Sequence, residues 1–151
     1  MRMDKHAGFT LIELMVALAI LAVIAGLAAP SFTQMIQRNR VAVAANELLA
    51  ALQLARTEAI RQRKPITACR RNEAGDACED GTDWSAGWLV LSANGVIRVW
   101  DPSQVVFTGP EGGAVFLADG RAGGARVFTV ESGNASRGVN LDATGRAGIA
   151  H

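Results

Sequence analysis

Hydrophobic side chains fill one segment near the N-terminus without interruption and follow two different periods after it. The uninterrupted segment is residues 9–29, FTLIELMVALAILAVIAGLAA, in which Glu13 is the single charge. At a rise of 1.5 Å per helical residue, this segment spans about 30 Å, which is the thickness of a bilayer core. The pattern therefore predicts one membrane-spanning helix.

A helical period of apolar residues follows Pro30. Ser31 is a candidate N-cap for a new helical segment, and Pro65 ends the pattern. The apolar positions recur at spacings of three and four and form one stripe: Val41, Ala45, Leu48, Leu52, Ala55 and Ala59. We interpret residues 31–64 as an amphipathic helix that lies on its own β-sheet; the alternative is a helix that binds a membrane surface or a partner.

The pattern beyond Pro65 is typical of β-strands. Short apolar runs separated by turn residues predict strands at 66–69, 88–92, 96–100, 105–108, 115–118, 126–130, 139–141 and 147–149. Asn94-Gly95 predicts a hairpin, because a two-residue primed turn needs positive φ at both positions, and Asp119-Gly120 is a weaker signal of the same kind. The glycine-rich segments 111–113 and 120–124 read as loops rather than phosphate cradles. The expected fold class is α+β, with a long N-terminal helix on an antiparallel sheet.

Charge sets the expected orientation. Arg2 and Lys5 precede the apolar segment, so the positive-inside tendency keeps the short tail in the cytoplasm and sends the chain after Pro30 across the membrane. An ordinary single-pass anchor and a signal peptide cleaved near residues 26–28 are the alternatives. The formal net charge of +1 excludes a global basic field that would drive bulk binding to nucleic acid.

Glu13 is the residue that a plain anchor does not need. A charged side chain within an apolar span costs about 2.5–3.5 kcal/mol on insertion scales. Cleavage between Gly8 and Phe9 would create an α-ammonium group one helical turn before Glu13, on the same or an adjacent chain. The carboxylate then has a partner and serves assembly.

These residues carry a family resemblance. The segment KHAGFTLIELMVALAILAVIAGLAAPSF resembles the leader and first helix of type IV pilins and type II secretion pseudopilins, and residues 39–64 resemble the GspH/FimT group among them. The resemblance implies that a prepilin peptidase cuts after Gly8, that Phe9 is N-methylated, that Glu13 sets subunit registration and that Pro30 marks a bend or melting point. It divides the chain into a leader, 1–8, a membrane and filament-core helix, 9–29, and a periplasmic pilin-like domain, 30–151, with its helix at 31–64 and its β-rich part at 66–151.

Cys69 and Cys78 enclose eight residues and form neither a CxxC redox pair nor a zinc knuckle. In an oxidising compartment outside the cytoplasm we expect a structural disulfide, with free thiols as the alternative. The order Cys69, Cys78, Trp84, Trp88 also resembles the FimT-like and FimU-like members of the group.

No pattern for catalysis or metal binding stands out. His6 and His151 lie at the two ends of the chain, and no nucleophile motif is present, so we expect no enzyme, cofactor or metal. The acidic residues Asp76, Glu79, Asp80 and Asp83 lack the alternating spacing of a calcium loop and read as a solvated loop. The two Trp residues read as anchors that pin a loop onto the sheet rather than as a base-stacking platform.

Residues 144–148, TGRAG, are similar to the Gly-Arg-x-Arg motif of DNA-binding FimT-like minor pilins, except that Gly148 stands in place of the second arginine. Arg146 would then act with basic residues that the fold brings near, among which Arg137, Arg126 and Arg121 are candidates. We expect weak DNA binding at most; the alternative is a turn arginine at the end of a hairpin.

The resemblance as a whole implies a single-pass inner-membrane protein that is a structural or priming subunit of a type IV pilus. Its implied partners are the prepilin peptidase and other minor and major pilins. The alternatives are pseudopilin H of a type II secretion system, with other pseudopilins as partners, and a DNA-binding minor pilin for uptake.

Overall fold

The computed structural model describes residues 9–101 and 103–150, with only the backbone for 27–30. Within these residues there is one helix, α1, which runs from Leu11 to Gln62 through two units that are described separately: one up to Met35 and one from Ile36 onward. The helix start expected at Ser31 is therefore wrong. A proline removes one backbone donor, and the backbone on both sides of it is helical, so no new N-cap is needed there.

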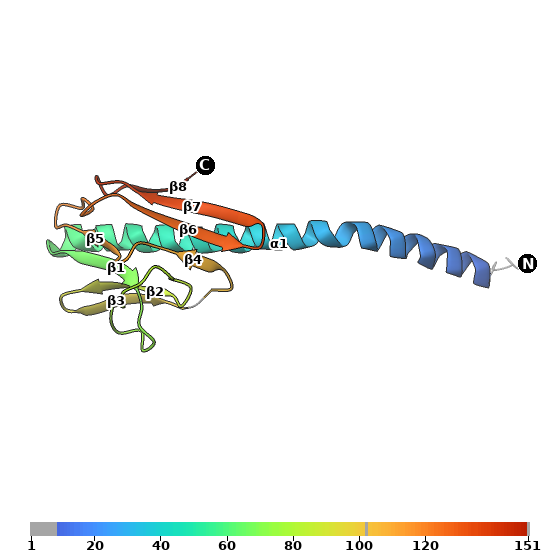
Figure 1. The fold of residues 1–151 in the computed structure, drawn as a ribbon, viewed down its shortest axis with the longest axis horizontal. Coiled ribbons are helices and arrows are strands. Elements are labelled where there is room, and N and C mark those ends of the chain that lie inside the picture. Colours follow the sequence, from blue (N-terminus) through green and yellow to red (C-terminus); the bar gives the residue numbers. More distant parts are fainter. Residues whose placement is uncertain (1–8, 102, 151) are drawn as a thin grey trace, which may run out of the picture. The chain divides into compact units, whose positions relative to one another are not determined.

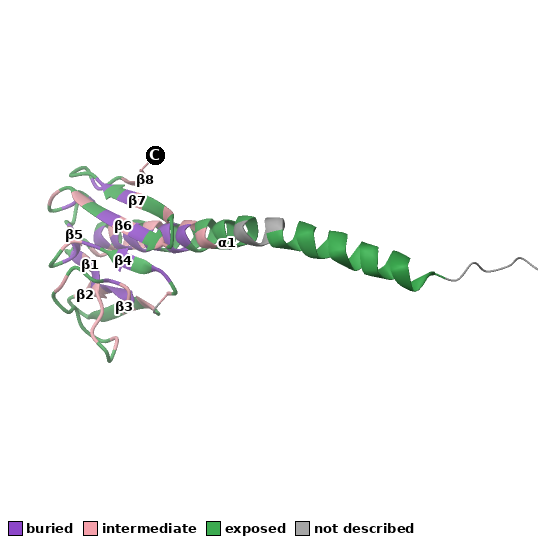
Figure 2. Cartoon of the chain, turned by 45° about the vertical axis from the view of Figure 1, so that its right-hand side comes forward, coloured by how far each residue is buried: buried purple, intermediate pink, exposed green. Residues whose placement is uncertain are grey.

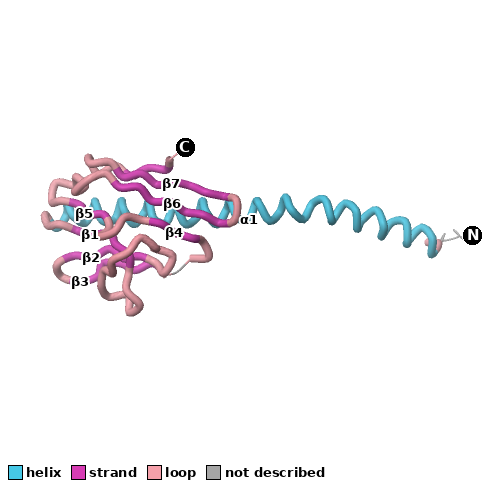
Figure 3. Tube along the Cα trace, in the orientation of Figure 1, coloured by secondary structure: helices cyan, strands magenta, loops and turns pink. Residues whose placement is uncertain are grey.

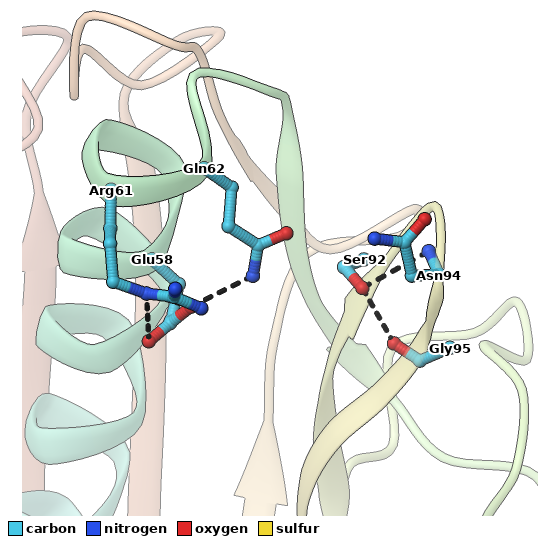
Figure 4. A network of polar contacts seen from close by, with 6 residues as sticks. All are labelled: Glu58, Arg61, Gln62, Ser92, Asn94 and Gly95. Carbon is cyan, nitrogen blue, oxygen red and sulfur yellow. Dashed lines mark hydrogen bonds and ion pairs between the residues drawn. The ribbon is translucent and has the colours of Figure 1, made fainter.

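The C-terminal end of α1 is defined by backbone conformation and local polar contacts. Arg63 follows the last helical residue and adopts the left-handed conformation, with φ of 53°, and Pro65 follows two residues later. In the last turn, the Glu58 carboxylate accepts hydrogen bonds from Arg61 at 2.6 Å and from Gln62 at 2.8 Å (Figure 4). These contacts lower the pKa of Glu58, chiefly through the hydrogen bond from Arg61.

Eight strands follow α1, and they form two four-stranded antiparallel sheets (Figures 1 and 3). The first sheet has the order β3-β2-β1-β5 and the second has the order β4-β6-β7-β8. The strands are β1 (Ile66–Arg70), β2 (Trp88–Ser92), β3 (Gly95–Trp100), β4 (Val106–Thr108), β5 (Ala114–Phe116), β6 (Arg126–Ser132), β7 (Ala135–Leu141) and β8 (Ala147–Ile149). All eight predicted strands are present, and the largest change in bounds is the longer β7.

The β2–β3 hairpin lies where it was predicted, but its turn is of a different type. Ser92 pairs with Gly95, so Ala93 and Asn94 are the central residues of the turn. Gly95 has a φ of 123°, whereas Asn94 does not have a positive φ, so the primed turn expected at Asn94-Gly95 is wrong. The Ser92 hydroxyl donates to the Gly95 carbonyl at 2.9 Å and accepts from the Asn94 amide at 3.2 Å (Figure 4). This side-chain bridge stabilises the turn without positive φ at Asn94.

The core of the second unit lies between the C-terminal part of α1 and both sheets (Figure 2). The predicted apolar stripe is confirmed, since each of its six residues is at most 2% exposed. Ala44 and Ala51 are buried on the same side, and small side chains let strands approach the helix closely. The sheets contribute the large core residues Trp88, Phe107, Phe116 and Phe128, and the loop before β2 contributes Trp84.

Candidate functional site

The first part of α1 exposes an apolar surface. Every described side chain from Phe9 to Gly26 is exposed, and an 18-residue window of the helix has a mean hydropathy of 2.7 with none of the window buried (Figure 2). By length and composition this segment is able to cross a membrane. Apolar area of this extent is stable only in lipid or against neighbouring subunits, so the first unit is a candidate assembly surface.

The N-terminal end of α1 has a local polar arrangement that includes Glu13. The Thr10 hydroxyl accepts a hydrogen bond from the Glu13 backbone amide at 3.3 Å, so Thr10 acts as the N-cap and Glu13 occupies position N3. The spacing T-x-x-E is that of a capping box, and this signal was overlooked in the sequence. An acidic residue in the first turn also interacts favourably with the positive end of the helix dipole. Glu13 thus has a structural role available besides pairing with a terminal amine.

Two of the predicted site residues, Gly8 and Pro30, are not fully covered by the described part of the structure. Gly8, at the expected cleavage point, lies outside the described residues, and so does the side chain of Pro30. Phe9 is described and is 86% exposed. The expected roles of Gly8 in cleavage and of Pro30 as a bend or melting point stay predictions.

Cys69 and Cys78 form a disulfide, with Cα atoms 5.6 Å apart. The loop between them is fastened by Arg71, whose guanidinium donates to the Ala86 carbonyl at 2.9 Å and lies 3.3 Å from the Asp101 carboxylate. Arg70 makes a second attachment, to the Asp80 carbonyl at 2.8 Å. The disulfide loop is thus held to the first sheet by hydrogen bonds as well as by the covalent bond.

Reduction of the disulfide in the full chain is expected to destabilise the domain after Ile36 by about 2–3 kcal/mol without unfolding it, because the closed loop is short and the helix–sheet core does not depend on it. The measurement is a denaturation curve followed by fluorescence of the three Trp residues, all of which lie in this unit. Two free thiols in unreduced protein recovered from the periplasmic side would contradict the prediction.

The segment that carries Trp84 is attached to the edge of β4. The Trp84 amide donates to the Phe107 carbonyl at 2.7 Å, and the Phe107 amide donates to the Ser85 hydroxyl at 2.9 Å. Hydrogen bonds from Ser85 lower the pKa of Asp83, which keeps this carboxylate ionised at the turn. The Trp84 ring is buried and meets Phe128 edge-to-face at 5.2 Å. The interpretation of Trp84 and Trp88 as anchors is confirmed, since both are at most 1% exposed.

The acidic loop is engaged in local contacts. Asp76 accepts a hydrogen bond from the Asn72 side chain at 2.8 Å, and Glu79 lies 3.3 Å from Arg70. Among the residues that the structure describes, no group of three or more His, Cys, Asp or Glu side chains is placed to hold a metal ion.

Arg146 lies in a tight turn between β7 and β8. The Asp142 carboxylate accepts hydrogen bonds from the Thr144 amide at 2.8 Å and from the Arg146 amide at 3.0 Å. The Thr144 hydroxyl and the Arg146 amide together lower the pKa of Asp142, so a carboxylate stays charged beside the Arg146 side chain. Arg56 of α1 supports the same turn by donating to the Thr144 carbonyl at 3.3 Å. This arrangement agrees with a turn arginine and weakens the attraction of Arg146 for phosphate.

The structure does not bring Arg137 to Arg146. Leu141 pairs with Ala147, so Arg146 lies near the end of β7, whereas Arg137 lies four residues earlier, about 13 Å along the strand. Arg121 forms an ion pair with Asp119 at 2.7 Å. Arg126 pairs with Leu141, the cross-strand partner of Ala147, but its guanidinium donates to the Gly113 carbonyl at 3.2 Å.

A cleft that sequence reasoning did not predict lies between α1 and the segment after β3. It has a volume of about 660 Å³ and combines apolar with charged side chains. Val43 is 58% exposed beside it, and Arg40, Glu47 and Asp101 line its margins. The cleft combines residues 39–47 with residues 99–101 and 103–105, which come together only in the folded chain.

Comparison with known proteins adds to this geometry. Residues 44–145 match the family model described as type II transport protein GspH, and residues 3–29 match the prokaryotic N-terminal methylation motif. No curated protein matches the chain.

Two solved structures are similar, and both are crystal forms of the type IV minor pilin FimU of Pseudomonas aeruginosa strain PAO1. The P21 form is 25% identical with a TM-score of 0.60 and covers 76% of this chain and 90% of FimU. The P65 form is 24% identical with a TM-score of 0.57 and covers 72% of this chain and 91% of that chain. The long helix, the antiparallel sheets and the two motif matches agree with one another: the chain belongs to the GspH family and has the fold of a type IV pilin-like subunit, as the minor pilin FimU does.

Proposed function

We propose that the chain is a minor pilin of a type IV pilus and acts as a structural and priming subunit near the filament tip. The observation that carries the proposal is the similarity to FimU, a type IV minor pilin, over 90% of the FimU chain. The exposed apolar start of α1 supports an assembly role, because this surface needs lipid before assembly and neighbouring helices afterwards.

The proposed location is the inner membrane, with a single span at residues 9–29 and the domain from Pro30 onward in the periplasm. Arg2 and Lys5 favour a cytoplasmic tail, and the disulfide between Cys69 and Cys78 suits an oxidising compartment. Assembly would then draw the subunit out of the bilayer together with other pilins. A prepilin peptidase is the proposed processing partner, as the methylation motif implies.

Processing is expected to leave a chain that begins with N-methylated Phe9, since Gly8 precedes the apolar run and cleavage there frees the amine that Glu13 can pair with. Intact-mass and N-terminal peptide mass spectrometry of protein from a host with prepilin peptidase measure this directly. The control is the same protein from a strain that lacks the peptidase, which should retain residues 1–8. A chain that begins at Ala29 would show signal-peptide removal and contradict the filament proposal.

A second candidate function is that of a pseudopilin of a type II secretion system, which the description of the matched family favours. Deletion of the gene distinguishes the role in a pilus from the role in secretion. Loss of surface pili, with normal release of exported enzymes, supports the pilus; the reverse result supports secretion. In either case, complementation with the intact gene must restore the phenotype.

DNA uptake is the weaker alternative. Gly148 replaces the second arginine of the motif, and the ionised Asp142 lies beside Arg146. Thirteen basic and 12 acidic residues follow Pro30, so attraction to phosphate would have to come from a local patch.

A further inference from the structure

A second, smaller pocket lies where α1 enters the domain that begins at Ile36. It has a volume of about 270 Å³ and is lined by residues of this part of α1 and of the β6–β7 hairpin. The hairpin runs beside α1 (Figure 1). The hairpin is held close to the helix here, since a Cβ at Gly133 would overlap the Gln37 side chain. The lining residues are Arg38, Val41, Asn134, Ala135, Ser136 and Arg137.

The strand register explains why Arg137 faces the helix. Arg137 is the cross-strand partner of Val130, which is fully buried, and Val139 two residues further along β7 is fully buried too. Because alternate residues of a strand share a face, Arg137 leaves the sheet on the side of α1. Arg38 lines the same pocket from the helix, so two arginines from distant parts of the sequence share one pocket.

The pocket is positively charged and contains unused donors. None of its six lining residues is acidic, and Asn134 adds a side-chain amide. The ion pairs found among the described residues involve neither Arg38 nor Arg137. The acidic residue of the hairpin, Glu131, is adjacent to Val130 along β6 and therefore projects from the opposite face of the sheet. Two guanidinium forks and a neutral amide are donors that match the oxygens of a phosphate group.

We infer that this pocket binds the phosphate of an anionic phospholipid headgroup. The inference rests on the proposed membrane anchor, because Arg38 follows Ala29, the last residue of the apolar segment, by only nine positions. Basic residues close to a membrane span are attracted to anionic headgroups. A pocket bounded by a helix on one side and a hairpin on the other suits a single phosphate, whereas a duplex presents a row of them. Lipid contact at this pocket would hold the domain at the bilayer surface until the subunit is extracted.

The test uses the full processed chain in a neutral detergent, with native mass spectrometry to count bound lipids. The probes are phosphatidylglycerol and phosphatidylcholine with the same acyl chains. The unmodified protein is expected to retain phosphatidylglycerol preferentially, and Arg38→Gln/Arg137→Gln to lower this preference by about tenfold or more. Arg137→Lys keeps the charge but not the planar guanidinium fork. Its preference for phosphatidylglycerol should lie between those of the unmodified protein and the double variant.

The matched control is Arg40→Gln/Lys64→Gln, which removes the same charge from exposed positions of the chain outside the pocket. Its lipid preference should equal that of the unmodified protein, and Trp fluorescence should show all variants folded. The inference would be overturned if the control lost as much of the preference for phosphatidylglycerol as the pocket variant, or if the pocket variant lost none of it. Displacement of the lipid by millimolar inorganic phosphate or by duplex DNA would also overturn it, in favour of a free-anion or nucleic-acid site. Each result is independent of whether the filament is a pilus or a pseudopilus.

Discussion

Glu13→Ala is expected to leave the chain inserted in the membrane and folded, and to remove most of it from the assembled filament. The variant removes a charge that costs about 2.5–3.5 kcal/mol in an apolar span, so insertion should be unchanged or improved. Incorporation should fall by tenfold or more, because the carboxylate then no longer pairs with the amine of Phe9 on the same or an adjacent subunit. The opposite signs of the two effects separate a role in assembly from a role in insertion.

The capping arrangement at the start of α1 supplies sharper controls. Glu13→Gln keeps a side chain that suits position N3 of a capping box but removes the charge, so it should fail to assemble as Glu13→Ala does. Thr10→Val removes the hydroxyl that accepts the Glu13 amide and keeps the carboxylate. This variant should lose about 1 kcal/mol of local helix stability and assemble nearly normally.

The measurement is the amount of the chain in sheared filaments, or bound to the other minor subunits, relative to the amount in the inner membrane. If Glu13→Gln assembles normally and Thr10→Val does not, the helix cap rather than the charge is what assembly requires. If all three variants assemble normally, Glu13 has no role in the filament.

Much of the fold could be predicted from the sequence because its patterns are local and strong. The stripe from Val41 to Ala59 has a helical period that only one face of a helix satisfies, and the buried side of α1 is this stripe. The eight strands were predicted for a similar reason, as apolar runs bounded by turn residues. These features depend on neighbours in the sequence.

What depends on distant residues was not predictable. The division of the strands into two sheets places β5 beside β1 and β4 beside β6, and no local signal specifies these pairs. The turn at Ala93-Asn94 differs from expectation because Ser92 bridges it with its hydroxyl, which a dipeptide rule does not consider.

The predicted site residues show the same limit. Arg137 and Arg146 are nine positions apart in the sequence, yet the register of β7 and β8 separates them, and Arg137 instead lines a pocket together with Arg38. The T-x-x-E spacing at Thr10, in contrast, is a local signal that the sequence carries by itself. The cleft beside Val43 had no such signal, because its two sides come from α1 and from residues 99–101 and 103–105.

Gly113→Ala is expected to destabilise the domain by about 3 kcal/mol or more, while the same change at the neighbouring Gly112 should cost only about 1 kcal/mol. Both glycines have positive φ, 71° at Gly112 and 75° at Gly113, so both variants carry the same conformational cost of an alanine in the left-handed region. The two positions differ in the room for a methyl group. A Cβ at Gly112 meets nothing within 4 Å, whereas a Cβ at Gly113 overlaps the Ala68 carbonyl of β1 and lies 3.0 Å from the Cys69 Cβ.

The difference between these two variants therefore measures the close approach of the segment before β5 to β1, with the conformational cost removed. Backbone atoms of a central strand cannot move aside as a flexible side chain can, so the overlap must displace Ala114 from its pairing with Ala68. A loss of about 3 kcal/mol is a large share of the 5–15 kcal/mol that stabilises a typical domain. Urea denaturation of the full chain in detergent, followed by the fluorescence of its three Trp residues, gives both values. Equal losses at Gly112 and Gly113 would mean that β5 can shift without cost, and that the pairing of β1 with β5 is looser than the structure indicates.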